Sequence, residues 1–367
     1  MSSCIGNIFK VSIFGESHGK GIGVTIFNVP SGFTIDFSRL DLILDRRRGI
    51  KDLSTSRREK DEYKILSGYF NNKTTGSPLT FFIENLDIDD KVYDDKKDIL
   101  RPGHSDYTAF LKYEGNQDYR GGGHFSGRLT TCMVIAGEIA NQLLNQKGIK
   151  VASRIKQIHQ IVDEDIVIDR SELFSYLNQQ EFPTFSSIRK EEMIEAIKNI
   201  RQEKDSLGGI VQTFVEMNNH IIGDPIFNSV ESKIASYLFA IGGLKGVSFG
   251  DGFEFASLKG SQANDSYSII DGKIVHLSNH NGGINGGITN NNLIIFNSVI
   301  KPTPSIGKKQ DSVNYLLKEK VDLEIKGRHD PCITPRALYV INSLTSLALI
   351  DMIMEEYGKR YFSEGQL

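Results

Sequence analysis

Several features that point to other classes of protein are scarce in this sequence. The chain has 367 residues, yet it contains only three cysteines and no tryptophan. Cys4, Cys132 and Cys332 are far apart and form no C-x-x-C pair, which excludes a disulfide framework and a zinc ribbon. The N-terminus shows no signal peptide, and we find no apolar run of the roughly 18 residues that a membrane span needs. The sequence therefore predicts a cytoplasmic protein without a membrane segment.

An excess of charge of one sign is also missing. The 43 Lys+Arg residues nearly balance the 46 Asp+Glu residues and give a formal charge of -3. Nucleic-acid-binding proteins usually have a strongly basic domain, so this balance argues against a nucleic-acid partner. Hydrophobic residues make up 39% and charged residues 24%, which is typical of a globular protein. The length allows one large domain or two ordinary ones.

Glycine, by contrast, is abundant and clustered. The 35 glycines include a triplet, Gly121 to Gly123, and the doublets Gly242-Gly243, Gly282-Gly283 and Gly286-Gly287. Isolated glycines usually make turns, whereas runs beside Arg, Lys or Asn indicate backbone brought close to a ligand.

Hydrophobic periodicity predicts a mixed set of strands and helices. Strands are expected over 11–14, 24–29, 79–83, 210–215 and 293–300, and helices over 36–48, 126–147, 190–202 and 336–357. The first helix should begin after an N-cap at Asp36 and stop at Gly49, and the last should have Thr334 as its N-cap and Pro335 as its first residue. Strands and helices do not alternate strictly, which favours the α+β class.

Two histidines stand in short loops that suit proton chemistry. His18 follows a predicted strand in Gly15-Glu16-Ser17-His18-Gly19, and we expect it to face a cleft. In Arg101-Pro102-Gly103-His104-Ser105-Asp106, a tight turn presents His104 with Asp106 near enough to orient the ring. Histidine can give or take a proton near neutral pH. A turn histidine bonded only to its own loop remains the alternative at each position.

Two further segments suit the binding of anions. Arg120 and Arg128 flank a glycine-rich stretch that runs into the helix expected to begin at Ser126, and a helix N-terminus attracts negative charge. Arginine adds fork-shaped donors that match phosphate and carboxylate. The stretch 326–332, Lys-Gly-Arg-His-Asp-Pro-Cys, concentrates charge before the last helix. A metal site built from the histidines and acidic residues is disfavoured, because no H-x-x-x-H spacing is present and cations lie nearby.

Taken together, these segments resemble chorismate synthase. The similar motifs are G-E-S-H-G at 15–19, R-P-G-H-x-D at 101–106, R-G-G-G…S-G-R at 120–128, G-G-I-x-G-G-I at 282–288, K-P-T-x-S at 301–305 and G-R-H-D-P-C at 327–332. They occur in the family's order and cover nearly the whole chain. The resemblance implies conversion of 5-enolpyruvylshikimate 3-phosphate to chorismate and phosphate, an anti 1,4-elimination in aromatic amino-acid biosynthesis that needs reduced FMN.

The resemblance also implies roles for residues. His104 matches the acid that protonates the departing phosphate, His18 the histidine beside the reduced flavin, and Asp330 a carboxylate that accepts a proton. Serines near the substrate and flavin match Ser17 and Ser126. Arginines that contact the substrate or flavin match Arg48, Arg128 and Arg328, and the adjacent Arg47 and Arg120 are also expected to bind the substrate. Flavin-binding positions match His124, Phe125, Ser126, Gly242, Gly243, Gly286, Lys301, Pro302, Thr303, Pro304, Ser305 and Arg328. Many relatives have Arg-Ser-Ser in place of His124-Phe125-Ser126, and Asn-Ala in place of Gly242-Gly243.

The family's architecture implies one catalytic domain over residues 1–367. Its fold is a β-α-β sandwich, with antiparallel sheets and flanking helices, assembled as a homotetramer with FMN near subunit boundaries. The length leaves no obvious reductase domain, so we expect an external flavin reductase and no bound metal. Another FMN-dependent lyase, a phosphatase acting on a cyclic polyol phosphate, and a flavin or phosphate carrier are the alternatives.

Overall fold

The computed structural model describes residues 3–51, 53–54, 61–86, 97–165, 168–325 and 329–363. Two antiparallel sheets of five strands dominate it. The first sheet has the order β1-β2-β3-β7-β4, with bounds Cys4–Ile5, Val11–Gly15, Gly21–Ile26, Leu79–Glu84 and Tyr63–Ser67. The second has the order β11-β16-β10-β8-β9, with bounds Leu244–Phe249, Ile294–Ile300, Gly209–Glu216, Lys150–Ile158 and Ile161–Val162. The predicted strands are therefore confirmed, with shifts of a few residues at their ends.

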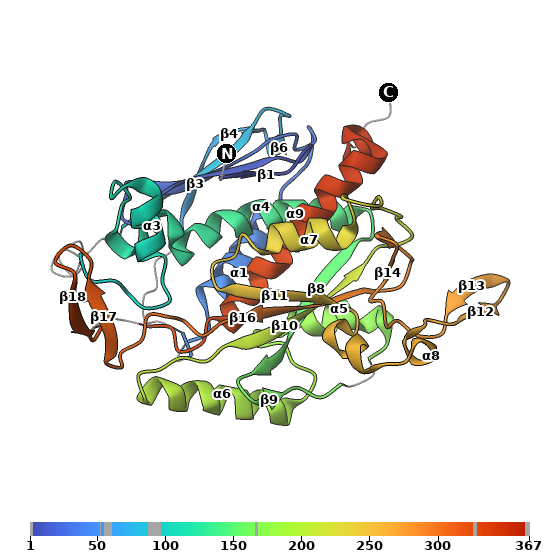
Figure 1. Cartoon of the computed structure of the whole chain (residues 1–367). Helices are drawn as coiled ribbons and strands as arrows, with labels where there is room; N and C mark the ends of the chain where they lie inside the picture. The colour runs from blue at the N-terminus through green and yellow to red at the C-terminus, as the bar shows by residue number, and fades with distance from the viewer. Residues whose placement is uncertain are drawn as a thin grey trace.

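A layer of helices separates the two sheets (Figure 1). It consists of α1 (Phe37–Arg48), α4 (Thr130–Gln146), α7 (Val230–Leu238) and α9 (Thr334–Tyr357). On the outer face of the second sheet lie α5 (Arg170–Gln179) and α6 (Ser187–Gln202), as Figure 1 shows. The expectations of an α+β fold and of a β-α-β sandwich are both confirmed. One connected core of buried side chains joins both sheets to the helices between them.

Short elements decorate this sandwich. Four hairpins pair β5 (Tyr69–Phe70) with β6 (Lys73–Thr74), β12 (Tyr267–Ile270) with β13 (Lys273–His276), β14 (Ile284–Asn285) with β15 (Ile288–Thr289), and β17 (Gln310–Asn314) with β18 (Glu319–Leu323). The helix α3 (Asp106–Tyr113) and short 3-10 segments at Arg120–Phe125 and Gly127–Leu129 follow the first sheet in the chain. Further short segments are α8 (Gly260–Ala263) and 3-10 turns at Gly252–Ser257 and Lys359–Phe362.

Capping sets where the helices begin. The side chain of Asp36 accepts a hydrogen bond from the backbone N–H of Arg39, and Gly49 ends α1 at a φ of 102°, both as predicted. The prediction for α4 was wrong by four residues. Ser126 caps a 3-10 turn instead, and the carbonyl of Gly127 accepts from the Arg47 guanidinium and from the hydroxyl of Thr130.

The last helix begins one residue earlier than predicted. Thr334 is the first helical residue of α9 rather than its N-cap, and Ile333 precedes it without a side-chain cap. Thr334 is fully buried in the core, which keeps its hydroxyl from the exposed position of a cap. Pro335 still costs no hydrogen bond, because the first four N–H groups of a helix have no partner inside it.

The helix α6 begins at Ser187, three residues before its predicted start, after an N-cap at Ser186.

One helix contradicts the expectation that no apolar run reaches membrane-spanning length. By length and composition α9 would pass as a membrane span, with a mean hydropathy of 1.6 over its best window. Of that window, 94% is buried inside the fold. Helices buried on every side are apolar all round, so the composition of α9 is explained by its place between the two sheets.

Candidate active site

The glycine triplet at 121–123 lies between the two candidate catalytic histidines. Gly121, Gly122 and Gly123 have φ values of 57°, 87° and 54°, a region that favours glycine. A Cβ on Gly121 would stand 2.1 Å from Cε1 of His18, and a Cβ on Gly122 would stand 3.6 Å from Nε2 of His104. Residues more than 80 positions apart therefore meet on one short piece of backbone.

The loop that carries His18 is buried rather than open to a cleft, which corrects the expectation from sequence. His18 is 4% exposed and Ser17 1% exposed, because the glycine triplet covers both. The backbone N–H of Ser17 donates to the carbonyl of Gly123 at 3.2 Å. Asn85 anchors the loop by donating from Nδ2 to the carbonyls of Glu16 and Gly19, each at 2.9 Å. Within the described chain, the buried hydroxyl of Ser17 has no hydrogen-bond partner.

The turn that carries His104 orients its ring as the sequence suggested. Nδ1 of His104 lies 2.7 Å from Oδ1 of Asp106. Burial alone would raise the pKa of Asp106, but hydrogen bonds from Arg101 and His104 outweigh burial and hold the pKa well below its usual range. An ionised carboxylate only accepts, so Nδ1 carries the proton and donates. Nε2 is left on the side of the ring that faces Gly122.

Three of the predicted arginines converge on Asp61, which the sequence analysis did not single out. Nη1 of Arg47 lies 3.3 Å and Nε of Arg48 3.9 Å from Oδ2 of Asp61, while Nη1 of Arg128 pairs with Oδ1. Burial is the main reason that the pKa of Arg47 falls to about 10, although Asp61 acts in the opposite direction. No signal in the sequence pointed to Asp61. It belongs to none of the motifs, and it follows a charged stretch of the kind that usually lies on a solvated surface.

The other candidate charges have closer partners of their own. Arg120 makes a bidentate pair with Asp118, with both distances 2.9 Å. Asp330 pairs with Arg336, whose Nε also donates to the carbonyl of Arg47 at 3.1 Å. Asp330 is thereby tied to the arginine cluster through the backbone of α1. Arg328 lies outside the described residues.

The segment Lys301 to Ser305 lies against the turn of His104. Nζ of Lys301 donates to the carbonyl of Gly103 at 2.7 Å, and its backbone N–H donates to the carbonyl of Gly243 at 2.9 Å. Pro304 is 3.3 Å from the place where a Cβ on Gly103 would be. Ser206 donates to the carbonyl of Thr303 at 2.8 Å, while the buried hydroxyl of Thr303 has no partner in the part of the chain described.

The remaining cofactor candidates divide into two groups. His124 lies near the His18 loop, with Nδ1 3.1 Å from the carbonyl of Gly15, and Phe125 is exposed. Gly242 is exposed beside Gly243. Gly286, in contrast, sits in the turn between β14 and β15, which Figure 1 shows on the opposite side of the molecule from α3. Within one chain, Gly286 is therefore far from His18 and His104.

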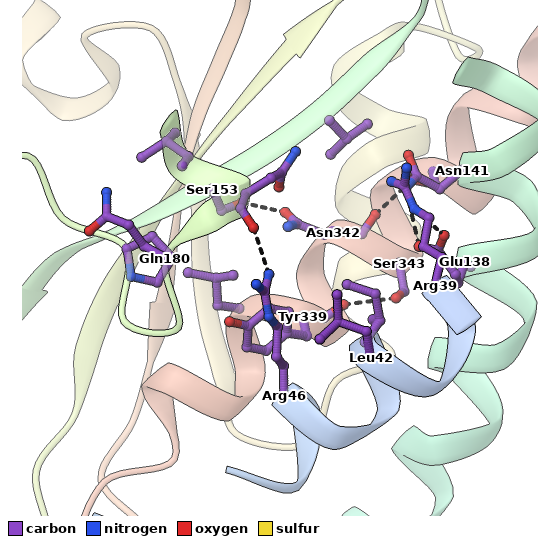
Figure 2. A pocket seen from close by; sticks show the side chains of 18 residues that line it. Arg39, Leu42, Arg46, Glu138, Asn141, Ser153, Gln180, Tyr339, Asn342 and Ser343 are labelled. Atoms are coloured by element: carbon purple, nitrogen blue, oxygen red, sulfur yellow. Dashed lines mark hydrogen bonds and ion pairs between the residues drawn. The ribbon is translucent and has the colours of Figure 1, made fainter. Parts of the chain in front are cut away.

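A cavity in the described structure lies apart from these residues. It has a volume of about 230 Å³ and lies between α1, α4, β8 and α9. Figure 2 shows Arg39, Glu138 and Arg46 at its edge, with the Arg39–Glu138 ion pair at 2.6 Å. Arg46 donates to the carbonyl of Asn178 at 2.7 Å. The chemistry-bearing histidines are absent from its lining, so we place the candidate site at the glycine triplet instead.

No group of three or more His, Cys, Asp or Glu side chains suited to a metal ion occurs among the described residues. The candidate site instead combines two histidines at the glycine triplet with the arginines around Asp61, a donor set that suits anions.

Comparison with known proteins decides the family. The family model described as chorismate synthase matches residues 9–354. The chain belongs to the chorismate synthase family. It is thus an enzyme of aromatic amino-acid biosynthesis and a lyase, as the sequence predicted.

Individual relatives agree with this assignment. The chain is 42% identical to the chorismate synthase of Thermococcus kodakarensis over 349 residues, which cover 95% of this chain and 97% of the relative. It is 41% identical over 350 residues to that of Korarchaeum cryptofilum, covering 95% and 96%. A crystal structure of a chorismate synthase aligns with a TM-score of 0.75 at 26% identity, over 96% of this chain and 94% of that one.

Proposed function

We propose that this enzyme converts 5-enolpyruvylshikimate 3-phosphate to chorismate and phosphate by anti 1,4-elimination, with reduced FMN as its cofactor. The observation that carries the proposal is the meeting of His18 and His104 at one glycine triplet. The cluster of Arg47, Arg48 and Arg128 around Asp61 supports it, because a substrate with one phosphate and two carboxylates needs several cationic donors.

The residues present suit a flavin. The hydroxyl of Ser17, a serine expected near the substrate and flavin, and that of Thr303, a predicted cofactor position, are buried without partners in the described chain and are available to a bound group. We infer that FMN would be held by Ser17, His18, His124, Phe125, Ser126, Gly242, Gly243, Gly286, Arg328 and the segment Lys301 to Ser305. The reduced flavin supplies the transient electron transfer that makes this elimination possible, although the overall reaction has no net redox change.

The elimination breaks the bond between the ring carbon and the phosphate oxygen and removes one ring hydrogen. His104 would act as an imidazolium, with Nδ1–H held by Asp106, and would donate its second proton, on Nε2, to the departing phosphate and become neutral. Arg48 and Arg128 would stabilise the charge that develops on the phosphate oxygens. Asp330, held by Arg336, would receive the proton released from the substrate ring, and His18 would stabilise negative charge beside the cofactor.

Other parts of the proposal concern the whole protein. We infer that residues 1–367 act as one catalytic domain, which the connected core through both sheets supports. The placement of Gly286 away from the histidines (Figure 1) fits a flavin site near a subunit boundary. We propose that the assembly is the homotetramer that the family resemblance implies. We further propose that the enzyme works in the cytoplasm and takes reduced flavin from an external reductase.

The test is anaerobic turnover of 5-enolpyruvylshikimate 3-phosphate, followed at the chorismate absorbance with oxidised and then reduced FMN. We expect chorismate to form only when the FMN is reduced. Phosphate release without reduced flavin would instead indicate a phosphatase, and no release in either state would indicate a carrier. Addition of NADPH to the sample with oxidised FMN tests the external reductase, because product there would show that the enzyme reduces its own flavin.

A further inference from the structure

Asp61 is buried at the point where three arginines meet. It lies two residues before β4, its side chain is 1% exposed, and both of its oxygens are used. Oδ1 pairs with Arg128, and Oδ2 is shared by Arg47 and Arg48. The arginines come from separate elements, the last turn of α1 and the 3-10 turn before α4. A single carboxylate therefore joins two parts of the candidate site.

Among the described residues, three arginines share one buried carboxylate at this point, and Arg48 also pairs with the exposed Asp45. Guanidinium groups brought this close together in a place with little water repel one another strongly. Without Asp61, the guanidinium of Arg47 would be buried beside that of Arg128 with no carboxylate between them. Asp61 thus keeps the guanidinium groups close together, an arrangement that suits an anion.

The same network reaches the loop of His18. Nε of Arg128 donates to Oδ1 of Asn85 at 3.2 Å, and Asn85 donates to the carbonyls on either side of His18. Movement of Arg128 would therefore disturb both the anion-binding arginines and the histidine loop.

We propose that Asp61 is a positioning residue, which holds Arg48 and Arg128 in the geometry that binds the anionic groups of the substrate. This inference rests on the proposed function for the identity of the substrate, but the contacts that carry it are independent of that identity. Asp61 itself, surrounded by cations and almost without exposure, is not expected to contact the substrate.

The experiment separates positioning from simple support of the fold. Asp61→Asn keeps the shape of the side chain but leaves the buried Arg47 uncompensated, which can prevent folding. We therefore also compare Arg47→Gln with the double variant Arg47→Gln/Asp61→Asn, in which that buried charge is gone. Asp45→Asn is the matched control, because Asp45 pairs with Arg48 at 3.1 Å from a side chain that is 69% exposed.

Two quantities are measured for each variant: KM and kcat for 5-enolpyruvylshikimate 3-phosphate with reduced FMN, and the rise in melting temperature caused by inorganic phosphate. We expect the double variant to have a KM about tenfold or more above that of Arg47→Gln, with a smaller change in kcat and a reduced response to phosphate. Asp45→Asn should match the wild type in both measurements.

Three results would overturn the proposal. In the first, the double variant equals Arg47→Gln in KM and in its response to phosphate. In the second, the double variant loses kcat while its KM is unchanged. In the third, Asp45→Asn raises KM as much as the double variant does. If the wild-type enzyme forms no chorismate, the proposed function fails. The phosphate measurement then still decides the role of Asp61, because it requires only an anion site.

Discussion

Gly121 lies directly against His18, so that a Cβ at this glycine would stand 2.1 Å from Cε1 of the imidazole. Gly121→Ala should therefore displace His18 and reduce turnover at least about tenfold, because small misplacements of reacting groups are costly. Gly272→Ala is the matched control. Gly272 also has a positive φ, of 74°, but its Cβ would meet nothing within 4 Å. Equal turnover in the two variants would show that the contact with His18 has no functional consequence.

His104 should be required for turnover but not for flavin binding. His104→Ala is expected to lower kcat by about 10²–10⁴, the usual cost of removing a general acid, while the affinity for FMN stays unchanged. Stopped-flow absorbance at the chorismate band measures the rate, and flavin fluorescence measures binding. His276→Ala, on the outlying hairpin of β12 and β13, provides the control. Wild-type rates in His104→Ala would exclude this histidine as the acid.

Asp106→Asn should keep the fold but weaken catalysis. The amide cannot hold a proton on Nδ1 of His104 as the carboxylate does, so we expect kcat to fall by about tenfold to a hundredfold with little change in KM. A loss confined to KM would contradict the view that Asp106 orients the acid.

The same variant should change the acid stability of the protein. The pKa of Asp106 is lower in the folded protein than the roughly 3.9 of an unfolded chain, so its contribution to the free energy of unfolding is fully present above that value. The contribution is lost as the pH falls toward the folded pKa. Urea unfolding between about pH 3 and pH 6 should show the wild-type advantage over Asp106→Asn shrinking as the pH falls. A constant difference across that range would be inconsistent with a lowered pKa.

Of the three thiols, only Cys4 should react in the native protein. Burial raises the pKa of Cys132 to about 12 and that of Cys332 to about 11, and the thiolate is the reactive form. Cys4 is partly exposed. Labelling with an aromatic disulfide reagent should modify one thiol per chain before unfolding and three after it, and Cys4→Ser should abolish the fast phase. Rapid labelling of two or three thiols would show that the core opens.

Local patterns in the sequence determined much of this protein. Periodicity predicted five of the strands and four of the helices, but not β8, α3, α5 or α7. Asp36 and Gly49 marked the ends of α1, and the two-residue spacing of His104 and Asp106 predicted their hydrogen bond. These features depend on neighbours along the chain, where backbone geometry and side-chain reach are known in advance. The motifs likewise identified the family, because each is a short run of neighbouring residues.

Only the tertiary structure revealed the contacts between distant segments. It buried His18 under Gly121, and it placed Asp61 among arginines from α1 and from the turn before α4. In the structure α4 also begins later than predicted, after a 3-10 turn in which the carbonyl of Gly127 accepts a hydrogen bond from Arg47. The physical reason is that two sheets closing on a shared layer of helices decide which loops meet, and a carboxylate in a charged stretch looks the same in sequence whether it faces water or three guanidinium groups.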